Sequence, residues 1–472
     1  MKIINADQFI KGESIVFINN DKAIAEYLDA NQTDFLKKQQ SDKKELITIN
    51  NLSDLMFTLN PKISDNNSLD LEKYRKFGFQ IFQAINAEKK ESLFIDSKNF
   101  NTDHLLALIE GLILSSYTFN KYHSDIERNL NYLKTIRIKG NIRQKELTEL
   151  NSVCQAVSFA RDLVNEPVSY LTAEQLGDLI KLSSKNYGFS SVILEKKQIE
   201  ALKMGGLLAV NKGSFDPPTF SIMEWKPENP KNNKPIVIVG KGVTFDTGGL
   251  SLKPTAGSMD EMKSDMAGAA AVVGLMQAIA ANRLNVHVVG LVPATDNRPG
   301  NRAYAPQDII TMYDGTKVEV LNTDAEGRMI LADALSYAKK YQPELVIDLA
   351  TLTGAAHAAI GPYGIVAMGN ADESMKNKLK TSGEKVHERL VEFPFWDEYG
   401  ELIKSDIADI KNIGGKIGGA ITAGKFLEHF TDYPYIHLDI AGPAYINSRD
   451  GYKTQGGTGV GVRLLYDFFK NY

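Results

Sequence analysis

The sequence predicts an α/β fold in two domains. A smaller N-terminal α/β domain is expected over residues 1–143, followed by a connecting helix over residues 144–167. A larger C-terminal α/β domain over residues 168–472 is expected to have a mixed central sheet flanked by helices. The 472 residues, 43% of them hydrophobic, can bury two cores and exceed what one core usually supports. Segments typical of strands and helices also alternate along the second half.

The N-terminal part differs in composition from the rest. It is rich in Lys, Asn and Asp, has few glycines and contains no cluster of catalytic residue types. Glu91–Asp96 is typical of a strand and Leu105–Tyr117 of a helix, which favours an α/β scaffold. Gln144–Val164 has the apolar spacing of a helix. That helix should end near Pro167, because proline disfavours helical geometry in the residue before it.

The second half has the pattern of an α/β sheet. The polar, proline-containing segment Lys226–Pro235 predicts a loop between two strands. After this loop, hydrophobic periodicity predicts strands at Ile236–Val239, Val286–Val292, Lys317–Leu321 and Leu345–Leu349, and helices at Met266–Asn282 and Met329–Tyr341. The ends of these strands are where an open α/β sheet usually places its site.

Composition narrows the class of protein. With 54 basic and 58 acidic residues the formal charge is -4, so no overall field would draw the chain to nucleic acid or to an anionic membrane. Cys154 is the single cysteine, which excludes an internal disulfide framework and fits a reducing compartment. The N-terminus meets a charge too early for a signal peptide. The longest apolar stretch, Met266–Ala281, suits a buried helix better than a membrane span. We therefore expect a cytoplasmic protein without a membrane partner.

Four acidic side chains in glycine-rich segments carry the strongest chemical signal. They are Asp246, Asp265, Asp324 and Glu326. Brought together, these carboxylates would repel one another unless protons or cations neutralised them, and their hard oxygens suit divalent cations. Two such ions about 3.5 to 4 Å apart are the usual arrangement for hydrolysis by a bridging water. The segments therefore predict a two-metal site that attacks a carbonyl or a phosphoryl group.

The places of these carboxylates along the chain favour one shared site. Asp246 follows the first strand after the loop, and Asp265 precedes the long helix. Asp324 and Glu326 follow a later strand, and all four are expected at strand or helix ends of one sheet. Since alternate residues of an extended segment share a face, Asp324 and Glu326 should point into one pocket, with Ala325 turned away. Each residue alone could be a turn former, a helix cap or a surface charge.

Other motifs fail on inspection. Gly240-Lys-Gly242 follows a strand but lacks the spacing of a phosphate-binding loop, so it gives little support for nucleotide binding. His387-Glu388 lacks the second histidine of the helical zinc-protease motif. The chain contains no Gly-x-Ser-x-Gly sequence that would support a serine hydrolase.

Several segments closely resemble the leucyl aminopeptidase family of two-zinc exopeptidases. The most specific family signature is Asn322-Thr-Asp-Ala-Glu-Gly-Arg328, and it is intact. The other segments that carry the resemblance are Val239–Lys253, Met262–Gly268, Leu349–Gly354, Ser405–Asn412 and His437–Gly442. The resemblance covers residues 160–465, and the family has a smaller, divergent α/β domain before that region. Family members assemble as hexamers, so the resemblance implies a homohexamer here.

The resemblance implies a role for each carboxylate. Asp246 and Glu326 would contact both cations. Asp324 would complete one site, and Lys241 with Asp265 would complete the other. The ions would be zinc, with manganese, magnesium or cobalt as alternatives in one site. A lysine ligand must be neutral, so its pKa must fall well below about 10.4, which two adjacent cations favour.

Two further basic residues complete the implied mechanism. Lys253 would stay charged and stabilise the oxyanion of the tetrahedral intermediate, while a hydroxide bridging the cations attacks the first peptide carbonyl. Arg328 would hold a bicarbonate, acting as proton shuttle, through two parallel hydrogen bonds. The free amine of the substrate would bind one cation, which makes the enzyme an exopeptidase. That amine must be deprotonated, so activity is expected to be favoured at mildly alkaline pH.

An apolar pocket would select the side chain that is released. Its candidates are Met262, Thr351, Gly354, Ala441 and Ala444. Leu and other apolar residues are the expected substrates. A preference among Leu, Met and Phe does not follow from sequence, because one methylene contributes only about 1 to 3 kcal/mol of discrimination.

Two other functions stay open at this point. The carboxylates alone would also allow a two-metal phosphoesterase-type hydrolase. Some relatives of the family bind DNA, but the acidic balance of this chain does not support a DNA-binding role. The loop Asp296–Ala303 departs from the commoner family form by two extra positive charges and receives no role in the site.

Overall fold

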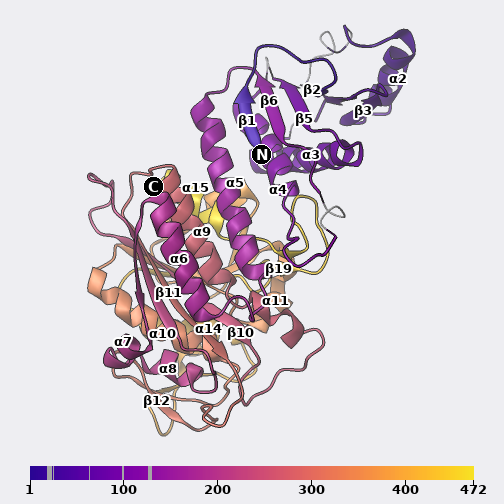
Figure 1. Ribbon diagram of the computed structural model, residues 1–472. Coiled ribbons are helices and arrows are strands. Elements are labelled where there is room, and N and C mark those ends of the chain that lie inside the picture. Colours follow the sequence, from indigo (N-terminus) through magenta and orange to yellow (C-terminus); the bar gives the residue numbers. More distant parts are fainter. Residues whose placement is uncertain (19–23, 25, 63, 98–99, 126–129) are drawn as a thin grey trace. The chain divides into compact units, whose positions relative to one another are not determined.

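The computed structural model describes residues 1–18, 24, 26–62, 64–97, 100–125 and 130–472. They form two compact units (Figure 1). The smaller unit comprises Met1–Gln155 and Ser448–Thr454, and the larger comprises Ala156–Asn447 and Gln455–Tyr472. The division falls within helix α5 (Gln144–Asn165), which confirms the long helix predicted there. Both units contain strands and helices, so the predicted α/β class is confirmed.

The smaller unit contains a sheet of six described strands beside helices. Its elements include β1 (Lys2–Asn5), β2 (Ser14–Ile18), α2 (Ala30–Ser41), β3 (Leu46–Asn50), β4 (Leu55–Leu59), α3 (Asn67–Ala87), β5 (Ser92–Asp96), α4 (Thr102–Ser115) and β6 (Thr135–Lys139). The strand order is β1-β6-β5-β2-β4-β3, in which β3 and β4 are antiparallel and the other neighbours parallel. Helices α3 and α4 approach each other at Gly78 and Gly111, where an added Cβ would meet the other helix's backbone. β5 and α4 confirm the strand and helix predicted in this part.

The larger unit contains a mixed sheet of nine strands in the part of the chain that the structure describes. These strands are β7 (Ser190–Leu194), β8 (Thr219–Trp225), β9 (Ile236–Gly240), β10 (Gly242–Asp246), β11 (Val288–Asn297), β14 (Leu345–Ala350), β15 (Ile365–Gly369), β16 (Leu390–Glu392) and β18 (Tyr435–Asp439). Their order is β16-β15-β18-β14-β9-β11-β8-β7, with β10 paired beside β11. The central strands β18, β14, β9 and β11 are parallel, whereas β15, β8 and β7 run antiparallel to their inner neighbours. The loop predicted at residues 226–235 joins β8 and β9, as expected.

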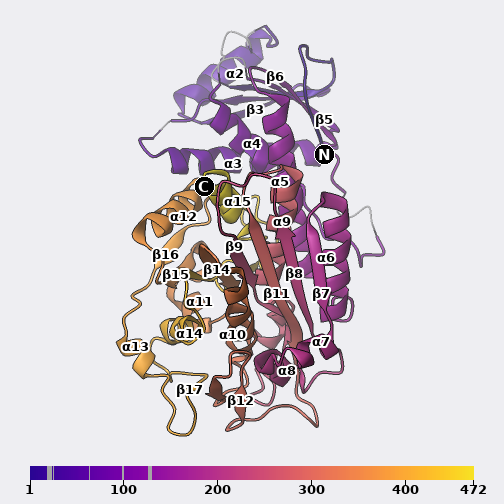
Figure 2. The same ribbon diagram turned by 90° about the vertical axis from the view of Figure 1, so that its left-hand side faces the viewer.

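Helices cover the larger sheet on both faces (Figure 2). The α-helices that lie wholly in the larger unit are α6 (Ala173–Tyr187), α7 (Lys196–Ala201), α8 (Gly205–Asn211), α9 (Ala267–Ala281), α10 (Glu326–Ala338), α11 (Gly354–Ile360), α12 (Glu373–Val386), α13 (Glu398–Glu401), α14 (Gly419–Glu428) and α15 (Val462–Lys470). Val237 and Val239 of β9 share one hydrophobic core with α10, α8 and α14. On the other face, Gly290 of β11 lies against Val272 and Met276 of α9. The central strands are therefore buried along their length, as parallel strands with two covered faces should be.

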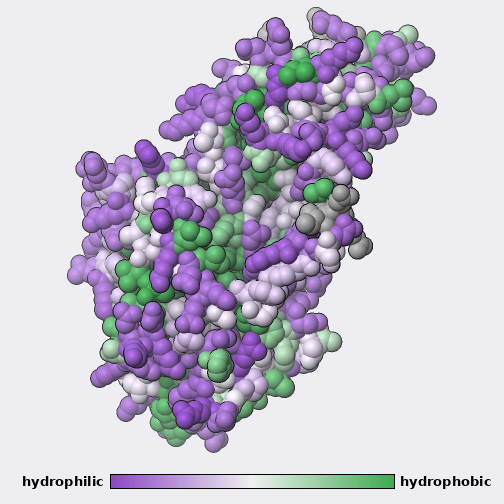
Figure 3. Space-filling view, viewed as in Figure 1, coloured by the Kyte–Doolittle hydropathy of each residue, from purple (hydrophilic) through white to green (hydrophobic). Residues whose placement is uncertain are grey.

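Helix α9 is a core helix. Together with the preceding 3-10 turn, η2 (Met259–Ser264), it is long and apolar enough to cross a membrane by composition alone, but 94% of its apolar 18-residue window is buried inside the fold. Hydrophilic side chains dominate the face of the molecule drawn in Figure 3. The burial of α9 fits the interpretation of residues 266–281 as a packed interior helix.

The prediction was wrong on one strand and on the start of one helix. The strand expected at 317–321 is the shorter β13 (Lys317–Glu319), and it pairs with β12 (Ile309–Thr311) and β17 (Ile410–Lys411) in a separate small sheet. Helix α10 begins at Glu326, three residues earlier than predicted. Asp324 and Glu326 therefore do not extend from a strand of the large sheet. A short apolar run does not reveal its lateral partners, since those lie far away in sequence.

One buried carboxylate anchors helix α10 to its neighbours. Asp333 is fully buried, and its oxygens accept hydrogen bonds from the backbone N–H groups of Leu207 in α8 and Tyr313 after β12, each at 2.9 Å. Burial raises the pKa of Asp333 to about 7, although the backbone N–H donors oppose that shift. The position of α10 matters because Glu326 and Arg328 are in its first turn.

We expect Asp333→Ala to lower the free energy of unfolding by about 2 to 4 kcal/mol, because two buried N–H donors lose their acceptor. Denaturant unfolding of the purified variant measures this change. Asp314→Ala is the matched control, since Asp314 is exposed and, among the described residues, accepts a hydrogen bond only from the N–H of Thr316, at 3.0 Å. An equal loss in the two variants would contradict an anchoring role for Asp333.

Candidate functional site

A cavity of about 280 Å³ opens at the carboxyl ends of the parallel strands of the larger sheet. Lys241 directly follows β9 and Thr351 directly follows β14. All twelve residues singled out from the sequence line this cavity, namely Lys241, Asp246, Lys253, Met262, Asp265, Asp324, Glu326, Arg328, Thr351, Gly354, Ala441 and Ala444. Ala325 lines it too, so the expectation that Ala325 turns away is wrong.

Different local structures bring the carboxylates to the cavity. Asp246 is the last residue of β10, and Asp265 stands between η2 and α9. Glu326 is the first residue of α10, and Asp324 lies in the turn before it, where its N–H is bonded to the side chain of Asn322 at 2.8 Å. Asp324 and Glu326 therefore converge through a turn that starts a helix, and not through the alternation of an extended strand.

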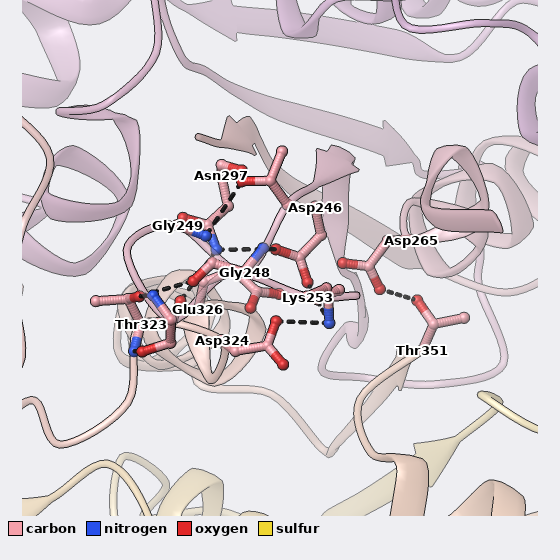
Figure 4. Close-up of polar contacts among 12 residues, drawn as sticks. Asp246, Gly248, Gly249, Lys253, Asp265, Asn297, Thr323, Asp324, Glu326 and Thr351 are labelled. Carbon is pink, nitrogen blue, oxygen red and sulfur yellow. Dashed lines mark hydrogen bonds and ion pairs between the residues drawn. The ribbon is translucent and has the colours of Figure 1, made fainter. Parts of the chain in front are cut away.

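Three of the carboxylates form a compact buried cluster. Asp246, Asp265 and Glu326 each offer an oxygen within 4.8 Å of the others, and all three residues are at most 4% exposed. Figure 4 shows their side chains directed toward a common space, with Asp324 and Lys253 beside them. Carboxylates so close in a water-poor environment cannot all be ionised without nearby positive charge.

Two lysines supply part of that charge. The Nζ atom of Lys241 is 2.8 Å from Asp265 Oδ1 and 2.9 Å from Glu326 Oε1. The Nζ atom of Lys253 is 3.0 Å from Asp246 Oδ2 and 2.6 Å from Asp324 Oδ1. Each carboxylate thus has a lysine partner, but with all four ionised the two lysine charges leave two negative charges in excess.

The pKa values of the carboxylates reflect this imbalance. Burial, with repulsion from Glu326, raises the pKa of Asp246 and of Asp324. Burial raises the pKa of Asp265 to about 7, in spite of Lys241. Burial alone would also raise the pKa of Glu326, but Lys241 and Lys253 together lower it. Extra positive charge would therefore be favourable here.

The donor set fits divalent cations. Asp265 Oδ1 accepts bonds from Lys241 and from Thr351 Oγ1 at 2.8 Å each, whereas its buried Oδ2 has no hydrogen-bond partner among the described residues. An unpartnered carboxylate oxygen inside a cluster of hard oxygen donors is a natural ligand for such an ion. Burial would lower the pKa of Lys241, but the carboxylates of Asp265, Glu326 and Asp246 raise it. Without cations, Lys241 is therefore a charged partner of the cluster.

Arg328 offers further hydrogen-bond donors at the cavity. Its Nη1 donates to the carbonyl oxygen of Asn412 at 2.6 Å, while Nε has no hydrogen-bond partner in the part of the chain that is described. Burial lowers the pKa of Arg328 to about 10, so the guanidinium stays charged at neutral pH. A buried cation with a free N–H is suited to a small anion.

Sequence reasoning assigns no role to two residues that hold the site in place. Asp439 accepts bonds from Thr353 Oγ1 at 2.7 Å and from the N–H groups of Leu352 and Ala441, and it thus fixes the wall of the expected pocket. Asn297 donates to Asp246 at 2.8 Å. Asp439 lies in the segment His437–Gly442, which carries part of the family resemblance. That resemblance could have indicated that Asp439 lies near the site.

Two profiles of one protein family match parts of this chain. The catalytic-domain profile of the cytosol aminopeptidase family matches residues 158–466, and the N-terminal-domain profile of the same family matches residues 65–125. A probable cytosol aminopeptidase of Chlorobaculum parvum is 54% identical over 68% of this chain; the match spans 63% of that relative, slightly under two thirds of its length. Another, of Geotalea uraniireducens, is 42% identical over 86% of this chain and 84% of its own.

Solved structures with a similar fold include two enzymes. A mutant of tomato leucine aminopeptidase has a TM-score of 0.87 and 27% identity, and the match covers 100% of this chain and 97% of that chain. The bottromycin maturation enzyme BotP in complex with Mn has a TM-score of 0.85 and 27% identity, over 100% and 99% of the two chains. The fold of this chain is therefore similar to that of both solved structures over its full length.

We expect Gly327→Ala to disturb the cluster. An added Cβ at Gly327 would lie 2.7 Å from Lys241 Nζ, so the amine must move away from Asp265 and Glu326. Although alanine favours a helix, this overpacking should lower the free energy of unfolding by about 1 to 3 kcal/mol. Gly400→Ala is the control. Gly400 lies in helix α13, and a Cβ added there would meet nothing within 4 Å. Denaturant unfolding that shows Gly327→Ala to be as stable as wild type would contradict the crowding argument.

Proposed function

The chain belongs to the cytosol aminopeptidase family, whose members depend on metal ions, and we propose that it releases N-terminal amino acids from peptides at this cavity. Leu and other apolar residues are the proposed preference. One observation carries the proposal: three buried carboxylates with oxygens within 4.8 Å of one another stand beside a lysine in an open cavity. Peptide substrates follow from the family.

The proposed cation ligands are the residues of the cluster. Asp246 and Glu326 would contact both ions, Asp324 would complete one site, and Lys241 with Asp265 the other. When bound, such ions supply Lewis acidity and a water that is nucleophilic near neutral pH. We propose zinc, with manganese, magnesium or cobalt as alternatives in one site. The Mn complex of the bottromycin maturation enzyme supports manganese among these.

Lys253 and Arg328 are the proposed catalytic residues of the chain itself. Burial would lower the pKa of Lys253, but Asp246, Glu326 and Asp324 raise it, so its ammonium is available to stabilise an oxyanion that develops on the substrate carbonyl. Arg328 would bind a bicarbonate through its remaining donors, and this anion would move a proton between nucleophile and leaving amine. Both residues line the cavity that the substrate would enter.

The substrate side chain would contact uncharged residues of the cavity lining. Met262, Thr351, Gly354, Ala441 and Ala444 are the residues proposed for this pocket. A Cβ placed on Gly354 meets nothing within 4 Å, which leaves room for a side chain there. Family membership supports two further proposals, namely assembly as a homohexamer and a cytoplasmic location.

Metal removal is the direct test. Chelation should reduce hydrolysis of leucyl anilide to background, and added zinc or manganese should restore it. Asp246→Asn should lower kcat/KM by about 100-fold or more, because an NH2 group replaces one carboxylate oxygen and the negative charge of this ligand is lost. The exposed variant Asp314→Asn is the control. Unchanged turnover after chelation would end the proposal, and hydrolysis of phosphate esters in place of the anilide would favour the phosphoesterase alternative.

Activity and cation affinity should both fall in mild acid. The pKa of Asp265 is raised to about 7, so this carboxyl is increasingly protonated below pH 7 and a cation must displace its proton. Affinity should therefore drop by up to about tenfold per pH unit below pH 7 for each proton displaced, and this group should have little effect above pH 8. Cation titrations and kcat/KM measured from pH 5.5 to 9 test this. A rate maximum below about pH 6 would disagree, because the substrate amine, with a pKa near 8, is then protonated.

A further inference from the structure

Asn297 lies fully buried directly behind the carboxylate cluster. It is the last residue of β11 and pairs in register with Asp246, the last residue of β10. Its side-chain Nδ2 donates to Asp246 Oδ1 at 2.8 Å and to the backbone oxygen of Thr323 at 3.0 Å. Figure 4 shows the amide of Asn297 directed at Asp246. One side chain thus contacts two of the three segments that carry the carboxylates, namely those of Asp246 and of Asp324 with Glu326.

The first of these bonds decides which oxygen of Asp246 faces the cavity. Asp246 Oδ1 accepts from Asn297 and also from the N–H of Gly248 at 2.8 Å, so this oxygen already has two donors. Asp246 Oδ2 is the oxygen that lies 3.0 Å from Lys253 Nζ. The amide therefore holds the carboxylate so that Oδ2 is available as a ligand.

The orientation of the amide is determined by its partners. Carboxylate and carbonyl oxygens accept only, so both must face the Nδ2 donor. Asn297 Oδ1 is left buried with no hydrogen-bond partner among the described residues. A Cβ on Gly249 would lie 2.8 Å from Asn297 Oδ1, so glycine is needed there. A buried acceptor without a partner is unfavourable, and such arrangements usually persist where they serve a function.

The bond from Asn297 to Thr323 connects two of the segments that carry carboxylates, namely residues 246–253 and 322–326. Thr323, which accepts from Asn297, precedes Asp324 and donates from Oγ1 to the backbone oxygen of Gly248 at 2.7 Å. The N–H of Ser251 in turn donates to Thr323 Oγ1 at 2.8 Å. These contacts hold the segment that carries Asp246 and Lys253 against the segment that carries Asp324.

We propose that Asn297 is a positioning residue for the cation site. It directs Asp246 Oδ2 toward the space between the carboxylates and sets the separation of the segments 246–253 and 322–326. The inference rests on the proposed binding of cations by this cluster. Asn297 itself would not touch the substrate, so it acts through Asp246.

The competing explanation is a purely structural role, and Tyr304 separates the two. The buried hydroxyl of Tyr304 donates to the same Thr323 oxygen at 2.9 Å. Tyr304→Phe thus removes a bond to one partner that Asn297 shares and leaves the bonds of Asp246 intact. Backbone bonds of residue 297 persist in any side-chain variant, since Thr247 donates to the Asn297 carbonyl oxygen from its N–H at 3.0 Å and from Oγ1 at 2.8 Å.

The experiment measures zinc and manganese affinity on full-length protein freed of metal by chelation, with titration calorimetry as the readout. Asn297→Ala should raise the dissociation constant about 10- to 100-fold, as is usual when a partner of a ligand is removed. Tyr304→Phe should keep it within about twofold. For leucyl anilide, Asn297→Ala should lower kcat at a fixed low metal concentration, with KM changed little and kcat largely recovered by excess metal.

Asn297→Leu keeps the branched shape of the side chain and replaces the alanine variant in the experiment if that variant does not fold. The same rise in the dissociation constant for zinc and manganese is expected. Metal affinity within twofold of wild type in a folded Asn297 variant would overturn the proposal. An equal loss of affinity in Tyr304→Phe would overturn it as well, because the effect would then be structural. Calorimetry does not require turnover, so a protein whose zinc affinity depends on Asn297 but that does not hydrolyse peptides would contradict only the proposed function.

Discussion

Compensation of charge among buried carboxylates is the constraint on which the larger unit's cavity depends. Asp246, Asp265 and Glu326 bring oxygens within 4.8 Å of one another where bulk water is excluded. Repulsion at that distance in a medium of low dielectric would oppose folding unless positive charge accompanies the cluster. Lys241 and Lys253 provide two charges, each shared between two carboxylates. The remaining imbalance makes divalent cations the chemically matched occupants.

Parallel strands and small residues make such convergence possible. The backbone of Lys241 is held between strand β14 and helix α9, since its N–H donates to Leu349 O at 3.0 Å and its carbonyl accepts from Ala269 N at 2.9 Å. Gly327 leaves the space that the lysine side chain occupies, and Gly268 lets helix α9 approach the backbone of Leu349 and Lys241, because a Cβ at either position would collide with these groups. The close approach of backbone and side chain is therefore built into the sequence as glycine.

Buried polar groups support both sides of the cavity. Asp439 fixes the segment around Thr353 on the side proposed for the substrate, and Asn297 holds Asp246 on the side of the carboxylates. In both cases a buried polar side chain bonds to backbone groups or to other site residues. Buried residues that hydrogen-bond to the side chains of a site restrict the movement of those side chains and so keep ligand oxygens in place.

The printed sequence was enough to predict the α/β class, helices such as α5 and α9, the residue types of the cluster and the family. Those properties depend on local periodicity and on short motifs, such as the segment from Asn322 to Arg328. Tertiary structure alone decided that β13 belongs to a separate sheet, that Asp324 and Glu326 meet through a helix start, and that Asn297 contacts Asp246. Strand pairing and side-chain contacts join residues tens of positions apart, and no local pattern encodes which distant partner will be adjacent.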